Sequence, residues 1–419
     1  MSFEALWESL LPVGRDGASG GYRRFSWTPE DAACRAWFTQ TAAERGLRVL
    51  TDRNGNLWAW WDPPGAPPRE SAAGGPAAPA RTGAVVTGSH LDSVPDGGAF
   101  DGPLGVVSAF AALDLLRERG CLPVRPLGVA AFTEEEGARF GVACLGSRLL
   151  AGAIDPGTAR ALADAAGITL AEAMAVAGHD PEAIGPDDDL LATVGAYVEL
   201  HIEQGRALAD LDAAIGIGEQ IWPHGRWRLG FTGRPDHAGT AVLADRHDPM
   251  LPFAAAVLAA RQAAASHGAL ATVGKVAAEP GAVNAVSARV TAWLDARGPD
   301  EETLQAVVGE VLAAAREAAA SHGVELAAEP ESATPAVRFD PGLREALASS
   351  LAARDIRAPV LPTGAGHDAG VLAARLPTAM LFVRNPTGVS HSPAEHAEPA
   401  DCAAGVQALA AVLADLACR

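Results

Sequence analysis

The segment Ser89-His90-Leu91-Asp92, followed by the glycine-rich turn at 97–102, constrains the fold of this chain more than any other feature. It continues the apolar run at 84–87, and such a run predicts a buried strand. A strand that ends in His-x-Asp and turns through glycines presents its side chains at the carboxyl edge of a sheet, where open α/β folds place their sites. Imidazole and carboxylate together suit zinc or a similar transition metal, and Asp92 could accept the other ring N–H of His90. The alternative is a turn after a core strand that happens to hold polar residues.

Composition narrows the class of protein. The chain has 419 residues, of which 49% are apolar, so two or three domains with a sizeable core are expected. No apolar run approaches a membrane span, and the amino terminus carries acids where a secretory signal needs cations, which predicts a cytoplasmic protein. The net charge of −19, with Lys275 as the only lysine, argues against nucleic-acid and anionic-membrane partners. Five scattered cysteines without a Cys-x-x-Cys pair argue against a disulfide framework.

Strands and helices alternate along the first part of the chain. The pattern predicts a helix within 26–46, a strand within 52–62, a strand at 84–88, a helix at 103–118 and a strand at 126–132. A further strand at 378–383 and a last helix at 400–417 follow near the end, whereas 63–83, rich in Pro, Ala and Gly, predicts a mobile surface loop. This order predicts a mixed, mostly parallel α/β sheet with flanking helices.

The middle of the chain has a different pattern. Strands and helices are predicted there in the order β-α-β-β-α-β, which is the ferredoxin-like plan. We therefore expect an inserted α+β domain at about 214–330 that serves as a lid or dimerisation domain. The catalytic α/β domain would comprise 1–213 and 331–419.

Four polar clusters end or interrupt the predicted strands. They are His90 with Asp92 and Asp101, Glu134 to Glu136, His201 with Glu203 and Gln204, and His391. Three adjacent glutamates are ordinarily an exposed acidic turn. Here they directly follow the apolar strand at 127–132, which would place them beside the His90 turn, where cations would offset their repulsion. Five plausible ligands favour a two-metal site, with the metals about 3.5–4 Å apart and a bridging carboxylate, over a single structural zinc. Cys144 is interpreted as a packed thiol.

Six motifs occur in an order that identifies a family. They are His-x-Asp, Gly-Gly-x-Phe-Asp-Gly, Glu-Glu-Gly-x-Arg-Phe, Glu-Leu-His-Ile-Glu-Gln-Gly, His-Ala-Gly-Thr and Ser-His-x-Pro-x-Glu. In this the chain resembles the amidase/hydantoinase/carbamoylase family, within the wider group of di-metal aminoacylases and carboxypeptidases. The resemblance covers nearly the whole chain, including the inserted domain.

The resemblance implies a metal centre with named ligands. One divalent metal would be held by His90, Asp101 and His201, and the other by Asp101, Glu136 and His391, with Asp101 as the bridge. Zinc, manganese, cobalt or nickel would suit these ligands. Glu135 matches the general base of the family, and Asp92 matches the residue that orients His90.

The resemblance also implies a substrate site and a homodimer. His237 matches a histidine that in relatives reaches across the dimer to polarise the scissile carbonyl. Gln204, Asn284 and Arg297 match residues that grip the substrate, with Arg297 on its carboxylate. After His-Ala-Gly-Thr many relatives read Thr-Pro-Met, whereas this chain has Ala241-Val242-Leu243. His367 and Asp368 resemble a family signature to which no role is assigned.

The expected function is therefore a metal-dependent amidohydrolase that cleaves the carbamoyl or ureido C–N bond of a small carboxylate. Allantoate and N-carbamoyl-L-amino acids are the substrate classes that the resemblance implies, and His201, where peptidase branches more often have a carboxylate, favours this branch. The alternative enzyme is a dipeptidase or N-acyl-amino-acid deacylase of the same di-metal group. A third alternative is a binding protein without activity, against which the presence of Glu135 and every ligand argues.

Overall fold

The computed structural model describes residues 2–65 and 82–418 and divides into two compact units. Unit 1 comprises Met1–Glu219 and Arg338–Arg419, and unit 2 comprises Gln220–Val337. The expected insert at 214–330 begins earlier and ends earlier than unit 2, because 215–221 pairs with the large sheet and the last strand of unit 2 continues to Thr334. Most of the predicted loop at 63–83 lies outside the described residues.

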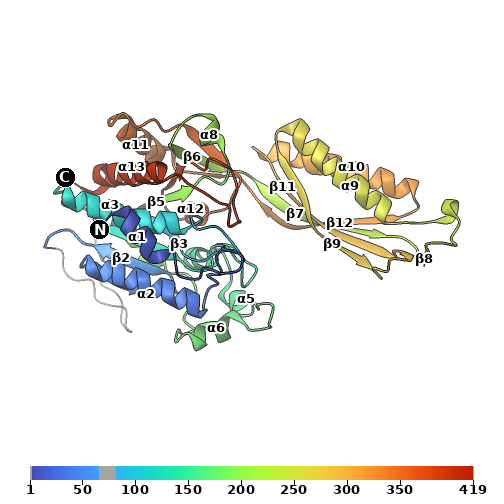
Figure 1. The fold of residues 1–419 in the computed structure, drawn as a ribbon, viewed down its shortest axis with the longest axis horizontal. Coiled ribbons are helices and arrows are strands. Elements are labelled where there is room, and N and C mark those ends of the chain that lie inside the picture. The colour runs from blue at the N-terminus through green and yellow to red at the C-terminus, as the bar shows by residue number, and fades with distance from the viewer. Residues whose placement is uncertain (1, 66–81, 419) are drawn as a thin grey trace. The chain divides into compact units, whose positions relative to one another are not determined.

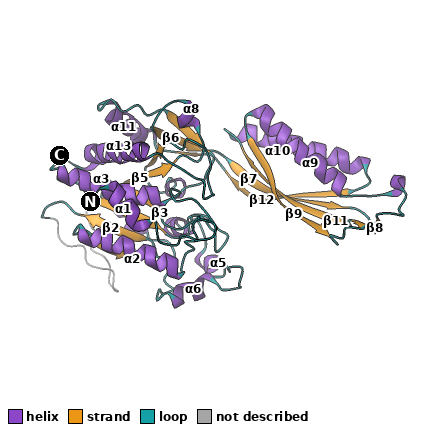
Figure 2. Cartoon of the chain, in the orientation of Figure 1, coloured by secondary structure: helices purple, strands orange, loops and turns teal. Residues whose placement is uncertain are grey.

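Unit 1 is built on a nine-stranded mixed sheet (Figures 1 and 2). The main path of the sheet runs β1-β2-β4-β3-β5-β15-β6-β13, and β14 pairs with β6. The strands are β1 Arg48–Thr51, β2 Leu57–Trp61, β3 Ala84–His90, β4 Leu127–Phe132, β5 Val194–Ile202, β6 Ile215–Ile221, β13 Val337–Arg338, β14 Val360–Thr363 and β15 Thr378–Val383. The predicted strands at 84–88, 126–132 and 378–383 are present, and the predicted mostly parallel α/β architecture is confirmed for the sheet centre, where β4, β3, β5 and β15 are parallel.

Helices flank this sheet. The described helices of unit 1 are α1 Phe3–Leu10, α2 Pro29–Glu44, α3 Pro103–Glu118, α4 Leu145–Ala151, α5 Pro156–Arg160, α6 Leu170–Val176, α7 Asp188–Thr193, α8 Ala207–Asp210, α11 Pro341–Ala352, α12 Asp368–Leu372 and α13 Pro399–Ala417. The main core contains side chains of α1, α2, α3, α11 and α13 together with those of the sheet. By length and composition α13 could cross a membrane, but 61% of its apolar window is buried inside the protein, as a core helix requires.

The parallel strands bring four distant segments to one edge of the sheet. β3 ends at His90, β4 ends immediately before Thr133, and His201 is the penultimate residue of β5. The registers align these ends, because His90 is paired with Phe132 and His201 with Phe382. The carboxyl ends of parallel strands in an open α/β sheet form the usual location of a site.

Unit 2 contains a four-stranded antiparallel sheet in the order β12-β7-β11-β9, with helices α9 and α10, and a short β8–β10 pair. The elements are β7 His224–Thr232, β8 Asp236–His237, the 3-10 helix Leu243–Asp245, α9 Met250–His267, β9 Leu270–Glu279, β10 Ala285–Val286, β11 Arg289–Arg297, α10 Glu301–Ser321 and β12 Glu325–Thr334. Alternate residues of β7 and β11 are buried, which is the period of a sheet with one covered face. Leu229, Phe231 and Leu294 belong to this separate core.

Gly88 tests how tightly the central strands pack. Its φ is +142°, and a Cβ there would lie 1.9 Å from the carbonyl oxygen of Ala130 on β4. We expect Gly88→Ala to lower the free energy of unfolding by about 2–4 kcal/mol, through strain and overpacking between two backbones. Urea unfolding measures this change. Gly17→Ala is the control, because nothing lies within 4 Å of the Cβ it would add, and an equal loss in both variants would contradict the argument.

Candidate metal centre

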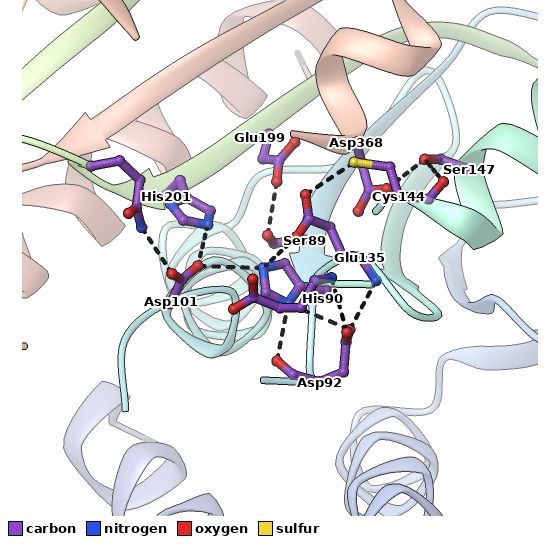
Figure 3. Close-up of polar contacts among 12 residues, drawn as sticks. Ser89, His90, Asp92, Asp101, Glu135, Cys144, Ser147, Glu199, His201 and Asp368 are labelled. Atoms are coloured by element: carbon purple, nitrogen blue, oxygen red, sulfur yellow. Dashed lines mark hydrogen bonds and ion pairs between the residues drawn. The ribbon is translucent and has the colours of Figure 1, made fainter. Parts of the chain in front are cut away.

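His90, Asp101 and His201 converge at the carboxyl edge of the large sheet. Their donor atoms all lie within 4.8 Å of one another, and all three residues are buried. Oδ1 of Asp101 lies 3.5 Å from Nε2 of His90 and 3.2 Å from Nε2 of His201. Figure 3 shows both imidazoles facing this carboxylate. These residues stand 11 and 100 positions apart along the chain, so the parallel strands are what bring them together.

The backbone fixes which nitrogen of each ring faces the carboxylate. Nδ1 of His90 lies 3.1 Å from the carbonyl oxygen of Asp92, and Nδ1 of His201 lies 2.8 Å from that of Ile202. A carbonyl only accepts, so each Nδ1 carries the hydrogen of the neutral ring and each Nε2 presents a lone pair. Within the described part of the chain both Nε2 atoms are buried without a hydrogen-bond partner. Two converging lone pairs beside a carboxylate fit a divalent transition metal.

Asp101 also belongs to a second group of donors, with Glu136 and His391. Nε2 of His391 lies 3.4 Å from Oδ2 of Asp101 and 3.5 Å from Oε2 of Glu136. The two oxygens of Asp101 therefore face different donor groups, which is the arrangement of a carboxylate that bridges two cations. The donor set fits two divalent metals.

A third group, formed by Glu199, His201 and His367, shares His201 with the first group. The oxygens of Glu199 accept hydrogen bonds from Ser89 Oγ at 2.8 Å and from the Ala369 N–H at 2.9 Å. Because Nδ1 of His201 is occupied by the Ile202 carbonyl, one ring cannot serve the first and third groups at once. This third group therefore surrounds His201 and is not a separate metal site.

The structure changes the expected contribution of Asp92 to the orientation of His90. Its backbone oxygen holds the ring, while its carboxylate lies 3.5 Å from Nδ1. The carboxylate instead accepts the backbone N–H groups of Glu135, at 3.2 Å, and Glu136, at 3.0 Å. Asp92 thus links the His90 turn to the glutamate turn, and its carboxylate lies closer to the two amide nitrogens than to the ring.

The glutamate turn directs its three side chains to different places. Glu134 has φ +56°, a left-handed conformation that costs a non-glycine residue energy and often marks a functional site. Its carboxylate accepts the N–H groups of Arg139 and Phe140. Oε2 of Glu135 lies 3.6 Å from Nε2 of His90, so Glu135 borders the first donor group while Glu136 belongs to the second. Among the predicted clusters, Glu203 does not join the centre, because it accepts N–H groups at the start of α8.

Behind Glu135 lies a buried polar network that was not predicted (Figure 3). The Cys144 thiol donates to Oε1 of Glu135 at 3.1 Å, and Ser147 Oγ donates to Asp368 at 2.5 Å. Burial raises the pKa of Glu135 well above its usual range, although His90 opposes this shift. Burial, reinforced by Glu199, likewise raises the pKa of Asp368. The prediction of Cys144 as a packed thiol missed this hydrogen bond, which no sequence spacing indicates. For Glu199 a signal existed, since it lies two residues before His201 on one strand face.

Gln204 contacts the centre directly. Its Nε2 donates to Oδ2 of Asp101 at 3.0 Å, and Ser390 Oγ contributes a longer contact of 3.4 Å to the same oxygen. Gln204 therefore lies where a substrate near Asp101 would meet it.

The other predicted substrate residues lie in unit 2. The β8–β10 pair brings His237 opposite Ala285, and the Ala238 N–H donates to the Asn284 carbonyl, so His237 and Asn284 lie close together. Nδ1 of His237 accepts the Gly239 N–H at 3.0 Å, which assigns the ring hydrogen to Nε2. His237 is thereby prepared to donate a hydrogen bond from an exposed position.

Arg297 lies at the other end of the unit 2 sheet. Arg297 ends β11 and is paired with His224, the first residue of β7. Arg289, at the opposite end of β11, is paired with Thr232, the last residue of β7. The chain continues from Thr232 to β8, which carries His237. Nε of Arg297 donates to Asp295 at 2.9 Å. The structure therefore does not bring Arg297 together with His237 within one copy of unit 2.

Removing metal should make the stability of the protein depend on pH. Burial and then Asp101 raise the pKa of Glu136 to about 8, from an ordinary value of 4.5. Burial lowers the pKa of His90, but Glu135, Asp101 and Asp92 outweigh it and raise this pKa well above its usual range. Both groups bind protons more tightly in the folded chain, so unfolding releases protons and stability falls as pH rises between 4.5 and about 8.

We therefore expect the Tm of the chelator-treated protein to fall from about pH 5 to about pH 8. The metal-loaded protein should lack this decline, because bound cations keep the carboxylates ionised. Thermal unfolding followed by circular dichroism measures both. A metal-free Tm that rises over this interval would contradict the assignment.

The chain is similar to known proteins over nearly its whole length. Residues 86–415 match the model of peptidase family M20/M25/M40. An N-carbamoyl-L-amino acid amidohydrolase of Geobacillus stearothermophilus is 36% identical over 97% of this chain and 96% of its own. An allantoate amidohydrolase of Escherichia coli is 31% identical over 99% of this chain and 98% of its own.

A solved structure gives the same result. A hydantoinase/carbamoylase family amidase from Burkholderia ambifaria superimposes with a TM-score of 0.83 at 33% identity, covering 100% of this chain and 98% of that chain. The chain therefore belongs to peptidase family M20/M25/M40, as a hydrolase of its amidase/hydantoinase/carbamoylase group, which acts on non-peptide C–N bonds.

Proposed function

We propose that this protein is a metal-dependent amidohydrolase that cleaves the carbamoyl or ureido C–N bond of small carboxylates. The observation that carries the proposal is the position of Asp101, whose two oxygens face two separate donor groups while Glu135 borders one of them. Relatives named for N-carbamoyl-L-amino acids and for allantoate support these two substrate classes.

In this proposal His90, Asp101 and His201 hold one divalent cation, and Asp101, Glu136 and His391 hold the other. Zinc, manganese, cobalt and nickel all suit these imidazole and carboxylate ligands. When bound, the cations supply a water of lowered pKa and polarise the scissile carbonyl.

Glu135 is the proposed general base. A base must lie within hydrogen-bond reach of the proton it takes, and Glu135 is held beside the first donor group by the Asp92 carboxylate and the Cys144 thiol. The proton that Glu135 takes can pass from it to the leaving amine, so one residue can serve both steps of the hydrolysis.

Three residues provide substrate recognition in this proposal. The guanidinium of Arg297 offers a planar fork that matches a substrate carboxylate. His237, with its ring hydrogen on Nε2, donates to the carbonyl oxygen as charge develops there, and losing one such donor typically costs about 2.7–4 kcal/mol of barrier. Asn284, beside His237, and Gln204, beside Asp101, hold the ureido group.

We further propose that the protein acts as a cytoplasmic homodimer. β11 has nine residues, and at about 3.4 Å per residue it spans about 27 Å, so a small substrate cannot reach both Arg297 and His237 of one copy. A second copy can supply the missing residue. The side chains that would cover such an interface are exposed apolar groups on α9 and on the edge strand β9, namely Met250, Leu251, Val257, Leu258, Leu270 and Val276.

A substrate panel tests the activity. With added Mn²⁺, Zn²⁺, Co²⁺ or Ni²⁺, we expect turnover of allantoate or of an N-carbamoyl-L-amino acid to exceed that of dipeptides and N-acyl-amino acids. Glu135→Gln should keep both metals and lose at least about 100-fold in kcat, the lower range for general base catalysis. Glu118→Gln, an exposed carboxylate at the end of α3, is the control. Faster turnover of a dipeptide or acyl-amino acid would identify the alternative enzyme of the same family.

Subunit mixing tests the dimer. His237→Ala and Glu135→Gln chains, each inactive alone, should regain about a quarter of wild-type activity when mixed, because half the dimers would be mixed and each would hold one intact site. The measurement is activity after the two variants are dissociated and reassociated together. Mixed dimers without any recovery would mean that His237 acts within its own chain.

A further inference from the structure

We propose that Glu395 is a positioning residue that sets the geometry of both proposed metal sites, by holding the backbone of Asp101 and the turn that carries His391. This inference rests on the proposed function, since the residues it positions are the proposed ligands. Glu395 is the last residue of the Ser-His-x-Pro-x-Glu motif and is buried. The proposed function gives a role to His391 of this motif but none to Glu395.

The first observation is a pair of hydrogen bonds to backbone amides. Oε2 of Glu395 accepts the N–H of Phe100 at 2.9 Å and the N–H of Asp101 at 3.0 Å. Glu395 stands 294 residues from Asp101 along the chain and is only 5% exposed. One carboxyl oxygen can accept both N–H groups, and burial removes the water that would compete for them. The backbone N–H of Asp101, the proposed bridging ligand, is thus held by a residue from a distant segment of the chain.

The second observation is the space reserved for this carboxylate. A Cβ at Gly98 would lie 2.3 Å from Oε2 and 2.5 Å from Cβ of Glu395. Only glycine therefore allows the 97–102 turn to approach Glu395 this closely. The same turn also packs against α1, because the Trp7 ring stacks on the Phe100 ring with centroids 4.9 Å apart.

The third observation connects Glu395 to the other metal ligand. His391 has φ +53°, and the Glu395 N–H donates to the Ser392 carbonyl at 3.0 Å, so the two residues lie on one short hydrogen-bonded turn. His396, next along the chain, meets the edge of the Phe100 ring with centroids 6.1 Å apart. A shift of Glu395 must therefore move both the Asp101 backbone and the His391 turn.

These contacts indicate that position 395 needs an oxygen acceptor for two backbone N–H groups. Metal ligands must stay within about 0.5 Å of the productive geometry. Removing a residue that hydrogen-bonds to a metal ligand commonly weakens metal binding by about 10–100-fold. Without the acceptor, two amide N–H groups in a buried turn would lack a partner, and the turn would relax to satisfy them.

The experiment compares metal binding by Glu395→Ala, Glu395→Gln and the wild type, using Mn²⁺ or Zn²⁺ titration against a chelator and the visible absorption spectrum of the Co²⁺-loaded protein. We expect Glu395→Ala to bind at least one equivalent about 10–100-fold more weakly and to alter the Co²⁺ spectrum. Glu395→Gln should bind within about threefold of wild type, because its amide oxygen has two lone pairs and can accept both N–H groups. Glu398→Ala is the matched control, since Glu398 lies on the same loop, is exposed and contacts His396 only at 3.2 Å.

The outcomes separate the two proposals. Circular dichroism first establishes that each variant is folded. A folded Glu395→Ala protein that binds two metals as tightly as wild type, with an unchanged Co²⁺ spectrum, overturns the role of Glu395 and leaves the proposed function standing. A glutamine variant as weak as the alanine variant also overturns it, because the acceptor would then be irrelevant. A wild-type protein that binds no pair of metals overturns both proposals.

Discussion

The carboxylate of Asp101 is the constraint on which the rest of this site depends. It lies just before α3, where the helix N-terminus favours negative charge, and it is shared by three imidazoles from three segments of the chain. Burial opposes ionisation of Asp101, but His201 and His90 outweigh it and hold its pKa well below the usual range. The neighbouring Glu135 and Glu136 have pKa values raised by burial instead. Asp101 is thus kept ionised by its histidine neighbours, whereas Glu135 and Glu136 need bound cations to become ionised.

The donor side chains of the site are held in place by hydrogen bonds that involve backbone carbonyl and amide groups. The carbonyls of Asp92 and Ile202 fix the two buried rings, and the amides of the glutamate turn are held by Asp92. These groups lie at or just beyond the carboxyl ends of the parallel strands β3, β4 and β5. The site is therefore precise because the sheet is rigid, and the strained residues Glu134 and His391 lie where that rigidity can hold them.

Unit 2 carries two residues that are proposed to recognise the substrate. Arg297 ends β11 of the four-stranded sheet, and His237 lies in the short β8–β10 pair. In the proposed function both residues recognise the substrate, and the proposed homodimer would supply them from two copies, with the exposed apolar residues of α9 and β9 at its interface.

The sequence by itself determined the parallel sheet, because continuous apolar runs such as 84–87 and 127–132 are typical of strands buried on both faces. It also predicted side chains of the candidate metal centre, since His-x-Asp and the triple glutamate each follow such a run. Only the tertiary structure decided how they are held. Periodicity does not reveal that 215–221 joins the large sheet, because strand pairing is a long-range choice. The Cys144 thiol and the Glu135 carboxylate meet at a spacing of nine residues that no helix or strand period predicts. The contact of Glu395 with the Asp101 amide joins segments 294 residues apart through a backbone N–H, which leaves no mark on the sequence.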